Sequence, residues 1–591
     1  MLKALYDYAL SHELALPEGY VKKTVAAYIM FSSEAPDFIE IWMGDDLAIP
    51  CPDIGSLANG KDKSNIIVEK RSVVIPDEEN AKSRFFLAAL ARLGEVDQDA
   101  KLCAEKLANP ELLQNIREKL DQNKIKPTNR ISFMVDSRKL HDSPHLLTWW
   151  QSFRQEILPP QKGELVPCLI TAQPTIPLLT TGNINGLSRV GGNSSGTPLF
   201  CFDKPAFCSY GQKQGANAPV SELAMNAVKS ALNDLLKGAP ILCGMKFVHW
   251  YDKDVIPEED PILSADLFGI EVEDEPEPER TKETELRAKK TADALVGAVK
   301  SGGSAILPDT GYHILLLSGV NGRAMVRRYE RGRYEELQAN LDRWNQDLSL
   351  VNPYGTGLCQ PMKLRRRLIR LLKYQKSDKK TLERLGKELS GITPSILMAI
   401  LSGGPLPDTV AVRALSHIRS KLLSAQDNEK TSAPDTLDRY ACQWLKVWLR
   451  RHTERRDEHL KEVFNPSHPE PAYHCGSAMA VYEAIQNTAM PNVNVTVVQR
   501  YYASCIQTPA LVLGRLSQHS IHHLEKIDSK YLRNYYHALL EQANAAIGPH
   551  IPVTLNLKQQ SYFALGYYQM AAHIRQARIN AANQKNEQEE A

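Results

Sequence analysis

The stretch YHILLLSGVNGRAMVRRYERG, residues 312–332, marks the place where the chain passes from strands to helices. Its Asn321-Gly322 pair stands between two apolar runs, and this dipeptide is typical of a two-residue β-hairpin turn. Directly after the hairpin, apolar residues recur every three or four positions and predict the buried face of a helix. These residues are Leu337, Leu341, Trp344 and Leu348. The hairpin is therefore predicted to end the β-containing part of the chain.

The regions on the two sides of this point differ in their periodicity. Before residue 255, short β-type runs alternate with segments of helical spacing. The β-type runs are TVAAYIMF (24–31), FIEIWM (38–43) and SNIIVEKRSVVI (64–75), and the helical segments are AKSRFFLAALARLG (81–94) and PELLQNIREKLDQN (110–123). From about residue 361 onward almost every segment reads as helix. The predicted fold class is an α+β N-terminal region followed by an all-α helical bundle.

A chain of 591 residues is too long for one hydrophobic core, and its length predicts roughly three or four domains. An acidic linker is expected between two structured parts, because residues 258–285 hold twelve acidic residues and two basic ones. We predict the following divisions: an α+β domain over 1–255, the acidic linker over 256–284, a hairpin and helix continuing the N-terminal domain over 285–360, a basic helical region over 361–470 and a C-terminal helical bundle over 471–591.

The composition is ordinary for a globular protein, with 43% hydrophobic and 24% charged residues. The first residues lack the apolar core of a signal peptide, and no apolar run approaches the roughly 18 residues that a membrane helix needs. The ten cysteines are scattered without zinc-like spacing, which favours a reducing compartment. The sequence therefore predicts a cytoplasmic protein with no membrane partner.

The net charge of +2 conceals a strongly basic block, since residues 363–380 hold nine basic residues and one acidic one. Within this block, Leu364, Leu368, Leu371 and Leu372 form one apolar stripe. The cations predicted to contact a nucleic-acid backbone are Arg365, Arg366, Arg367, Arg370 and Lys373. The alternative is a basic face that is solvated or paired with the acidic linker.

Alternation along the second hairpin strand is expected to place Arg323, Met325, Arg327, Tyr329 and Arg331 on one side. Arginines interleaved with a tyrosine are typical of surfaces that bind single-stranded nucleic acid by charge and stacking. Pairing with the acidic segment upstream is the alternative, and the sequence does not decide between them.

The loop SYGQKQGAN, residues 209–217, concentrates amides, a lysine and two glycines. Gln212, Lys213, Gln214 and Asn217 are candidates for reading DNA bases, since amides suit the edge of adenine. Gly211 and Gly215 would let the backbone approach a ligand, and Ser221 is the expected N-cap of the next helix. The alternative is that the amides only cross-link the loop.

A second basic loop and one further lysine complete the candidates. For base readout the second loop offers Asn59, Lys61, Lys63 and Asn65. For contact with the nucleic-acid backbone the further candidates are Lys70, Arg71 and Lys204.

No catalytic or metal-binding constellation is expected. Residues 192–196, GNSSG, match the letters of a nucleophile elbow, but a glycine-rich loop precedes them and a strand-like run follows, instead of a strand and then a helix. No phosphate-binding P-loop is present. His519, His522 and His523 lack a further ligand nearby, which favours surface histidines over a metal site. We therefore expect a protein that is not an enzyme and has no cofactor.

Several stretches, spread over nearly the whole chain, form a recognisable series. They are LKALYDYA, LPEGYVKK, FDKPAFCSYGQKQGANAPVSELAMNAVKSALNDLL, HILLLSGVNGRAMVRRYERGRYEEL, MAILSGGPLPDTVAVRALSHIRS, CGSAMAVYEAIQ and QQSYFALGYYQM. In content and order they resemble the large subunit of the type I-C CRISPR Cascade, the Csd family of the Dvulg subtype. The CGSAMAVYE segment and the acidic linker depart from the family pattern.

The resemblance implies a non-catalytic subunit of an RNA-guided surveillance complex. Such a subunit recognises the protospacer-adjacent motif in double-stranded DNA, helps to open the duplex, stabilises the R-loop and docks a helicase-nuclease. The implied partners are the guide RNA, the target DNA, and the backbone, crRNA-processing and small subunits of Cascade. Residues 1–255 would then be the DNA-recognition domain, and residues 471–591 would resemble the small subunit, which the family can also make separately. The alternatives are a nuclease or hydrolase, and a scaffold that contacts only guide RNA and sister subunits.

Overall fold

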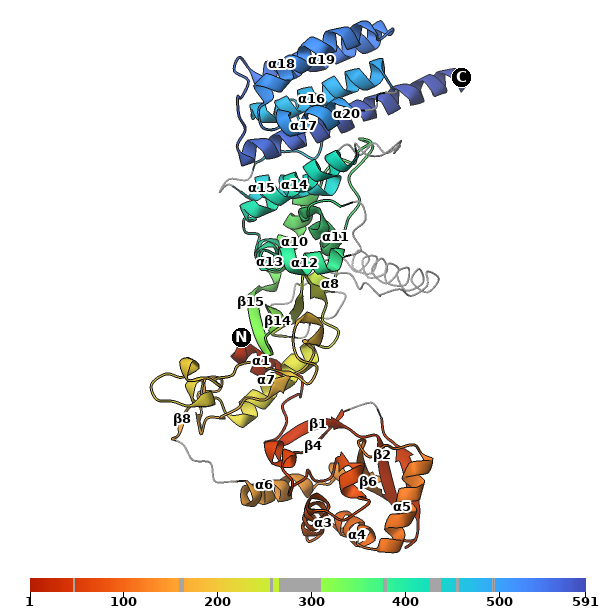
Figure 1. The fold of residues 1–591 in the computed structure, drawn as a ribbon, viewed down its shortest axis with the longest axis vertical. Helices are drawn as coiled ribbons and strands as arrows, with labels where there is room; N and C mark the ends of the chain where they lie inside the picture. Colours follow the sequence, from red (N-terminus) through yellow and green to blue (C-terminus); the bar gives the residue numbers. More distant parts are fainter. Residues whose placement is uncertain are drawn as a thin grey trace, which may run out of the picture. The chain divides into compact units, whose positions relative to one another are not determined.

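The computed structural model contains an N-terminal region of strands and helices and a C-terminal region that is mostly helical, which confirms the predicted fold class (Figure 1). The structure describes residues 1–45, 48–158, 164–253, 255, 259–264, 310–375, 380–425, 437–452, 457–491, 493 and 495–590. The predicted acidic linker, residues 256–284, lies outside these residues except for 259–264.

The chain divides into two compact units. Unit 1 comprises residues 1–184 and 198–234, and unit 2 comprises residues 185–197 and 235–591. The hairpin that follows the linker is thus grouped with the C-terminal helices. The domain boundaries suggested by the sequence at residues 256, 285, 361 and 471 stay predictions.

The main sheet of unit 1 has the strand order β3-β2-β6-β5, with β7 also paired to β6. The strands are β2 (Ala27–Phe31), β3 (Ile39–Met43), β5 (Glu69–Lys70), β6 (Arg130–Val135) and β7 (Arg138–Lys139). Strands β2 and β6 are parallel, and the other pairs are antiparallel. The core of this unit contains neighbouring aromatic side chains, in which Phe133 stacks on Phe31 and lies tilted against Phe86.

Four helices pack around this sheet: α3 (Ala81–Leu93), α4 (Gln98–Leu107), α5 (Pro110–Gln122) and α6 (Leu146–Ile157) (Figure 1). The predicted strands at 24–31 and 38–43 and both predicted helices are confirmed. The prediction of β-structure over 64–75 is mostly wrong, because only residues 69–70 pair as a strand and Arg71–Val74 form a helical turn, α2.

Unit 1 contains further elements outside this sheet and its helices. They include α1 (Leu2–Ser11), the paired strands β1 (Tyr20–Thr24) and β4 (Ala48–Pro52), the paired strands β8 (Val166–Pro167) and β9 (Pro174–Thr175), and α7 (Glu222–Leu235). Arg154 ties α6 to the start of α7, since its guanidinium lies 2.5 Å from Glu222 and 3.1 Å from Glu18. Charge pairing therefore fixes the position of α7, the helix that follows the candidate loop.

Unit 2 begins with an antiparallel sheet of order β12-β13-β14-β15. Its strands are β12 (Ile241–Leu242), β13 (Met245–Tyr251), β14 (Gly311–Val320) and β15 (Arg323–Arg333). The predicted Asn-Gly hairpin is confirmed: Asn321 has φ +49° and Gly322 φ +77°, the pair of positive values that a two-residue turn requires. Helix α10 (Tyr334–Leu348) then buries the predicted face, including Leu337, Leu341 and Trp344.

The rest of unit 2 is mostly helical where it is described. Its elements are α8 (Pro261–Ser264), α11 (Leu364–Leu368), η6 (Ile369–Leu371), α12 (Thr381–Leu389), α13 (Thr393–Ser402), α14 (Asp408–Ala425), α15 (Arg439–Arg451), α16 (Pro471–Ala489), α17 (Val497–Cys505), α18 (Pro509–Glu525), α19 (Lys530–Ile547) and α20 (Leu557–Glu590). One continuous apolar core joins the sheet face under α10 to helices α13–α20.

Helices α16 and α20 pack side by side at the centre of the C-terminal bundle (Figure 1). Two glycines make this contact possible. A Cβ atom on Gly566 would lie 1.9 Å from the carbonyl oxygen of Tyr473, and one on Gly476 would lie 2.0 Å from that of Phe563. Each helix thus presses its glycine against the backbone of the other, a separation that any side chain would forbid.

The same helix pair buries one carboxyl group. Glu483 of α16 is 6% exposed and accepts a hydrogen bond from the Tyr567 hydroxyl of α20. Burial raises the pKa of Glu483 to about 6, although the Tyr567 hydrogen bond and the charge of Arg575 oppose the shift. At neutral pH, the native state therefore holds an anion that the core disfavours.

A Glu483→Gln substitution is therefore expected to stabilise the protein at pH 8 by about 1–2 kcal/mol. Because the folded pKa is raised, the stability contributed by the neutral carboxyl is present below about pH 4.3, the ordinary value of glutamic acid, and is lost as the pH rises to about 6. The stabilisation by Glu483→Gln should therefore vanish at pH 4. Urea unfolding at both pH values tests this, with the exposed Glu541→Gln as the control. Equal stability of the Glu483→Gln and native proteins at pH 8 would contradict it.

Candidate nucleic-acid interface

The loop before α7 is held in shape by one amide. The Oδ1 atom of Asn217 accepts a hydrogen bond from the backbone of Ser209 at 2.7 Å. Its Nδ2 atom donates to the carbonyl of Gln212 at 3.2 Å and to that of Gln214 at 2.9 Å. The cross-linking alternative therefore describes Asn217, whose amide closes the loop on itself and does not face outward.

The backbone of this loop adopts several left-handed conformations. Tyr210, Gly211 and Gln214 have φ values of +52°, +73° and +47°. Gly215 is buried, and a Cβ atom there would lie 1.9 Å from the carbonyl oxygen of Leu178. Gly215 is thus required for contact with the protein's own backbone, whereas the sequence suggests that it would let the backbone approach a ligand. A tight, sharply turned loop follows from these contacts.

The side chains that this loop presents to solvent are polar and aromatic. Lys204, Gln212, Lys213 and Gln214 are exposed, and none has a side-chain partner within the described residues. Tyr210 is fully exposed, with a relative exposure of 101%. Tyr210 is not among the site residues predicted from the sequence. The signal that could have found it is its place directly before Gly211, since a turn there directs the preceding side chain outward.

The start of α7 is as predicted. The hydroxyl oxygen of Ser221 accepts a hydrogen bond from the backbone of Ala224 at 3.2 Å, which confirms Ser221 as the N-cap. Glu222 lies in the first turn and is paired with Arg154. The loop is therefore anchored at its end by a capped helix.

The second candidate loop is only partly available. Asn59, Lys61 and Lys70 are exposed. Lys63 instead donates to the carbonyl of Ile157 at 3.1 Å, and the amide of Asn65 bonds to Glu69 at 3.0 Å.

Arg71 is buried in the same region. Its guanidinium lies 2.6 Å from a carboxylate oxygen of Asp121 and bonds to the carbonyl of Ile125. These contacts hold strand β5 and helix α5 in place. Of the six candidates around this loop, three therefore stabilise the fold.

Contrary to the prediction, the arginines of β15 do not all lie on one face of the strand. The pairing shifts between Leu316 and Leu317, which is a β-bulge at Arg327. Because a bulge inverts the alternation, Tyr329 and Arg331 lie on the face of His313, and Arg323 and Met325 lie on the opposite face.

The two central side chains of β15 also have partners within the protein. Arg327 donates to the hydroxyl of Ser318 at 2.8 Å, although it is exposed. Tyr329 stacks on His313 with ring centroids 6.0 Å apart, and its hydroxyl lies 2.8 Å from Nδ1 of that histidine. Tyr329 is therefore engaged inside the sheet and does not offer a free ring to a base.

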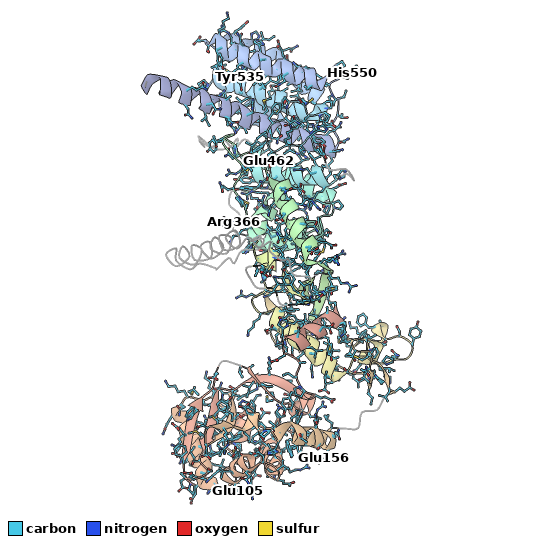
Figure 2. The ribbon with its side chains drawn as sticks, turned by 180° about the vertical axis from the view of Figure 1, so that it is seen from behind. Glu105, Glu156, Arg366, Glu462, Tyr535 and His550 are labelled. Atoms are coloured by element: carbon cyan, nitrogen blue, oxygen red, sulfur yellow. The ribbon has the colours of Figure 1, made fainter. Side chains whose placement is uncertain are left out.

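The basic block forms the short helix α11 and the turn η6, and its leucines are buried as expected. Leu364, Leu368, Leu371 and Leu372 are each at most 2% exposed. Among the cations, Arg366 and Lys373 are exposed and Arg365 is half-buried (Figure 2 labels Arg366).

Arg367 and Arg370 face the protein. The guanidinium of Arg367 donates to the carbonyl of Met362 at 2.9 Å and to the amide oxygen of Gln443. Burial lowers the pKa of Arg367 to about 10. Arg370 lies 3.3 Å from a carboxylate oxygen of Asp438. Both arginines thus help to fold unit 2.

The glycine-rich stretch that resembles a nucleophile elbow has a structural role. Residues 192–196 form a turn without a helix after it. Gly191 and Gly192 lie against Gly319 of β14, and a Cβ atom on Gly319 would be 2.0 Å from the backbone nitrogen of Gly192. In the parts of the chain that are described, no three His, Cys, Asp or Glu side chains are grouped to hold a metal ion. No helix in those parts is long and apolar enough to cross a membrane.

The chain is similar to a known protein family. No curated protein matches the chain. The family model for CRISPR-associated protein (Cas_Csd1) matches residues 66–575, which include the loop before α7, the hairpin and the basic block. Since this match covers most of the chain, the protein belongs to the Cas_Csd1 family of CRISPR-associated proteins.

Proposed function

We propose that the chain is the large subunit of a type I-C Cascade and recognises the protospacer-adjacent motif in double-stranded DNA. The observation that carries this proposal is the loop of residues 204–217. It presents Gln212, Lys213 and Gln214 together with the fully exposed Tyr210 on a backbone that Asn217 cross-links. A loop braced in this way loses little conformational freedom on binding, so that its contacts can discriminate between bases.

Each exposed side chain of the loop suits a different part of a DNA duplex. The amides of Gln212 and Gln214 can donate to and accept from base edges. Lys213 and Lys204 carry the charge that phosphates attract. An exposed ring such as that of Tyr210 can enter a base step and unstack it, which would begin the opening of the duplex. The loop thus combines readout with local separation of the strands.

The exposed cations of unit 2 suit the later steps. Arg327, Arg331, Arg366 and Lys373 would hold the phosphates of the displaced strand and so stabilise the R-loop. In this proposal the subunit has no chemistry of its own. It works in the bacterial cytoplasm beside the guide RNA, the Cascade backbone, crRNA-processing and small subunits, and it docks the helicase-nuclease after the R-loop has formed.

Substitutions in the loop should separate base readout from phosphate contact. In the assembled complex with guide RNA, Gln212→Ala or Gln214→Ala is expected to cost about 1–3 kcal/mol of discrimination between correct and scrambled flanking motifs. Lys213→Ala should weaken binding to all duplexes alike and flatten the dependence on salt. Tyr210→Ala should leave motif preference intact and slow strand opening, measured by the fluorescence of 2-aminopurine beside the motif.

The matched control is Gln518→Ala, the same change at an exposed position of α18. It should alter neither motif preference nor opening. If both loop glutamines can be replaced without any change in motif preference, the loop is not the reader. Metal-dependent cleavage of DNA by the purified chain would overturn the non-catalytic part of the proposal.

A further inference from the structure

Strand β3 is an open edge of the main sheet in unit 1. It pairs with β2 on one side, and among the described residues no strand pairs with its other side. The pairing with β2 is regular over all of Ile39–Met43, without a bulge. The sequence from 38 to 43 contains neither lysine nor proline. Natural edge strands are commonly protected by such features, because unpaired backbone groups attract other strands.

The hydrogen-bond register shows which backbone groups face outward. The N–H of Gly44 donates to the carbonyl of Ala26 at 2.9 Å, just beyond the pair Ala27–Met43. In an antiparallel ladder this bond makes Ala27–Met43 a non-hydrogen-bonded pair, so that the groups of Trp42 and Glu40 face β2. The N–H and C=O groups of Ile39, Ile41 and Met43 therefore face the open edge.

Apolar side chains flank this row of backbone groups. Trp42 and Met43 are 46% and 61% exposed, and Phe38, directly before the strand, is 40% exposed. Phe38 and Trp42 lie on one face of the strand together with Glu40, whose carboxylate accepts a hydrogen bond from the Trp42 indole at 3.0 Å. An added strand would thus gain both backbone hydrogen bonds and an apolar contact.

Charge indicates which partner fits this edge. Residues 32–45 contain four acidic residues and no basic one. The acidic residues are Glu34, Asp37, Glu40 and Asp45, and all are exposed. Lys106 bonds to the carbonyl of Pro36 within this stretch. Such a surface repels phosphates, and two copies of it would repel each other. It attracts a basic polypeptide.

We propose that β3 accepts a strand from a different protein chain, and that this strand alternates apolar residues with lysine or arginine. Strand addition of this kind obtains affinity from the main chain and specificity from the flanking side chains. The site lies before residue 66, where the family match begins, and is independent of DNA recognition by the loop of residues 204–217.

The first test uses a short synthetic peptide of alternating valine and lysine with the full-length chain. Its binding, measured by fluorescence anisotropy, should fall roughly tenfold in Ile41→Pro, because proline removes an outward N–H while leaving every bond to β2 in place. Ile41→Val keeps that N–H and should bind as the native chain does. Glu40→Lys should weaken this peptide and strengthen one in which glutamate replaces lysine. Glu40→Lys also keeps the test decisive if the proline variant unfolds.

The second test uses the assembled complex. Site-resolved hydrogen exchange should show new protection at the amides of Ile39, Ile41 and Met43 on assembly, and no change at Glu40 and Trp42, which are already bonded. A photo-crosslinker at Trp42 should capture a basic segment of a partner protein. Capture of nucleic acid or of a second copy of the chain, or equal peptide binding by Ile41→Pro and Ile41→Val, would overturn the proposal.

Discussion

Gly566→Ala is expected to lower the free energy of unfolding of unit 2 by about 3 kcal/mol. The new Cβ atom would lie 1.9 Å from the carbonyl oxygen of Tyr473, an atom of a helix backbone that cannot rotate away. Helices α16 and α20 would have to separate, and the contacts between them, the largest in the bundle, would loosen along their length. Urea unfolding followed by far-ultraviolet circular dichroism measures this loss. Gly476→Ala should behave alike, because it meets Phe563 in the reciprocal way.

The control for this prediction is the same substitution where a helix has room. Gly514 lies on the exposed side of α18, and a Cβ atom there would meet nothing within 4 Å. Gly514→Ala is therefore expected to stabilise the protein by about 0.5–1 kcal/mol, the ordinary advantage of alanine over glycine inside a helix. If Gly566→Ala proved as stable as Gly514→Ala, helices α16 and α20 could not be packed at this distance.

Local patterns in the sequence predicted those parts of the fold that local rules control. The Asn321-Gly322 turn, the buried face of α10 and the N-cap Ser221 follow from residue preferences that act over a few positions. The failure at residues 64–75 shows the limit of these rules. Ile66 and Ile67 are fully buried in the core without pairing as a strand, and Ile67 adopts φ +63°. The β-branched residues of this segment indicate that it is buried, but burial alone does not mean that it pairs as a strand.

In the candidate site, too, some features could be predicted from the sequence and others could not. The burial of Arg367 could have been read from the sequence, since it lies three residues after Leu364 and four before Leu371, on the apolar face. The partner of Arg370 could not have been predicted from the sequence, because Asp438 lies far away along the chain. The bulge at Arg327 has no local signal either, and it reversed the predicted faces of β15. A count of cations therefore overestimates the surface that is available to nucleic acid.

The buried carboxylate of Asp438 lies near three basic side chains, of which Arg370 is one of the candidate cations. Its Oδ2 atom lies 3.0 Å from Lys421, 3.3 Å from Arg370 and 3.8 Å from His417. Its Oδ1 atom caps α15 by accepting hydrogen bonds from the backbones of Tyr440 and Ala441, both at 3.1 Å. Burial alone would raise the pKa of Asp438, but the imidazole of His417 and the charges of Lys421 and Arg370 outweigh it and hold this pKa well below its usual range.

Asp438→Asn is expected to cost about 3 kcal/mol of unfolding free energy at pH 7, because it leaves Lys421 and Arg370 without their counter-charge. Asp438→Ala should cost about 1 kcal/mol more, since it also removes the helix cap. The matched control is Asp342→Asn on α10, where the carboxylate is exposed and bonds to Gln338, and the expected change there is within about 0.5 kcal/mol. Urea unfolding of the three variants at pH 7 gives the comparison.

The pH dependence of this loss separates charge from shape. Because the folded pKa of Asp438 is depressed, its contribution is fully present above about pH 4, the ordinary value of aspartic acid, and is lost as the pH falls below it. The gap between native protein and Asp438→Asn should stay constant from pH 8 to pH 5 and shrink below pH 4. A gap that persists unchanged into acid would mean that packing and not charge holds α15. If Asp438→Asn cost no more than Asp342→Asn, Arg370 would not be committed to Asp438 and would return to the set of cations that can bind DNA.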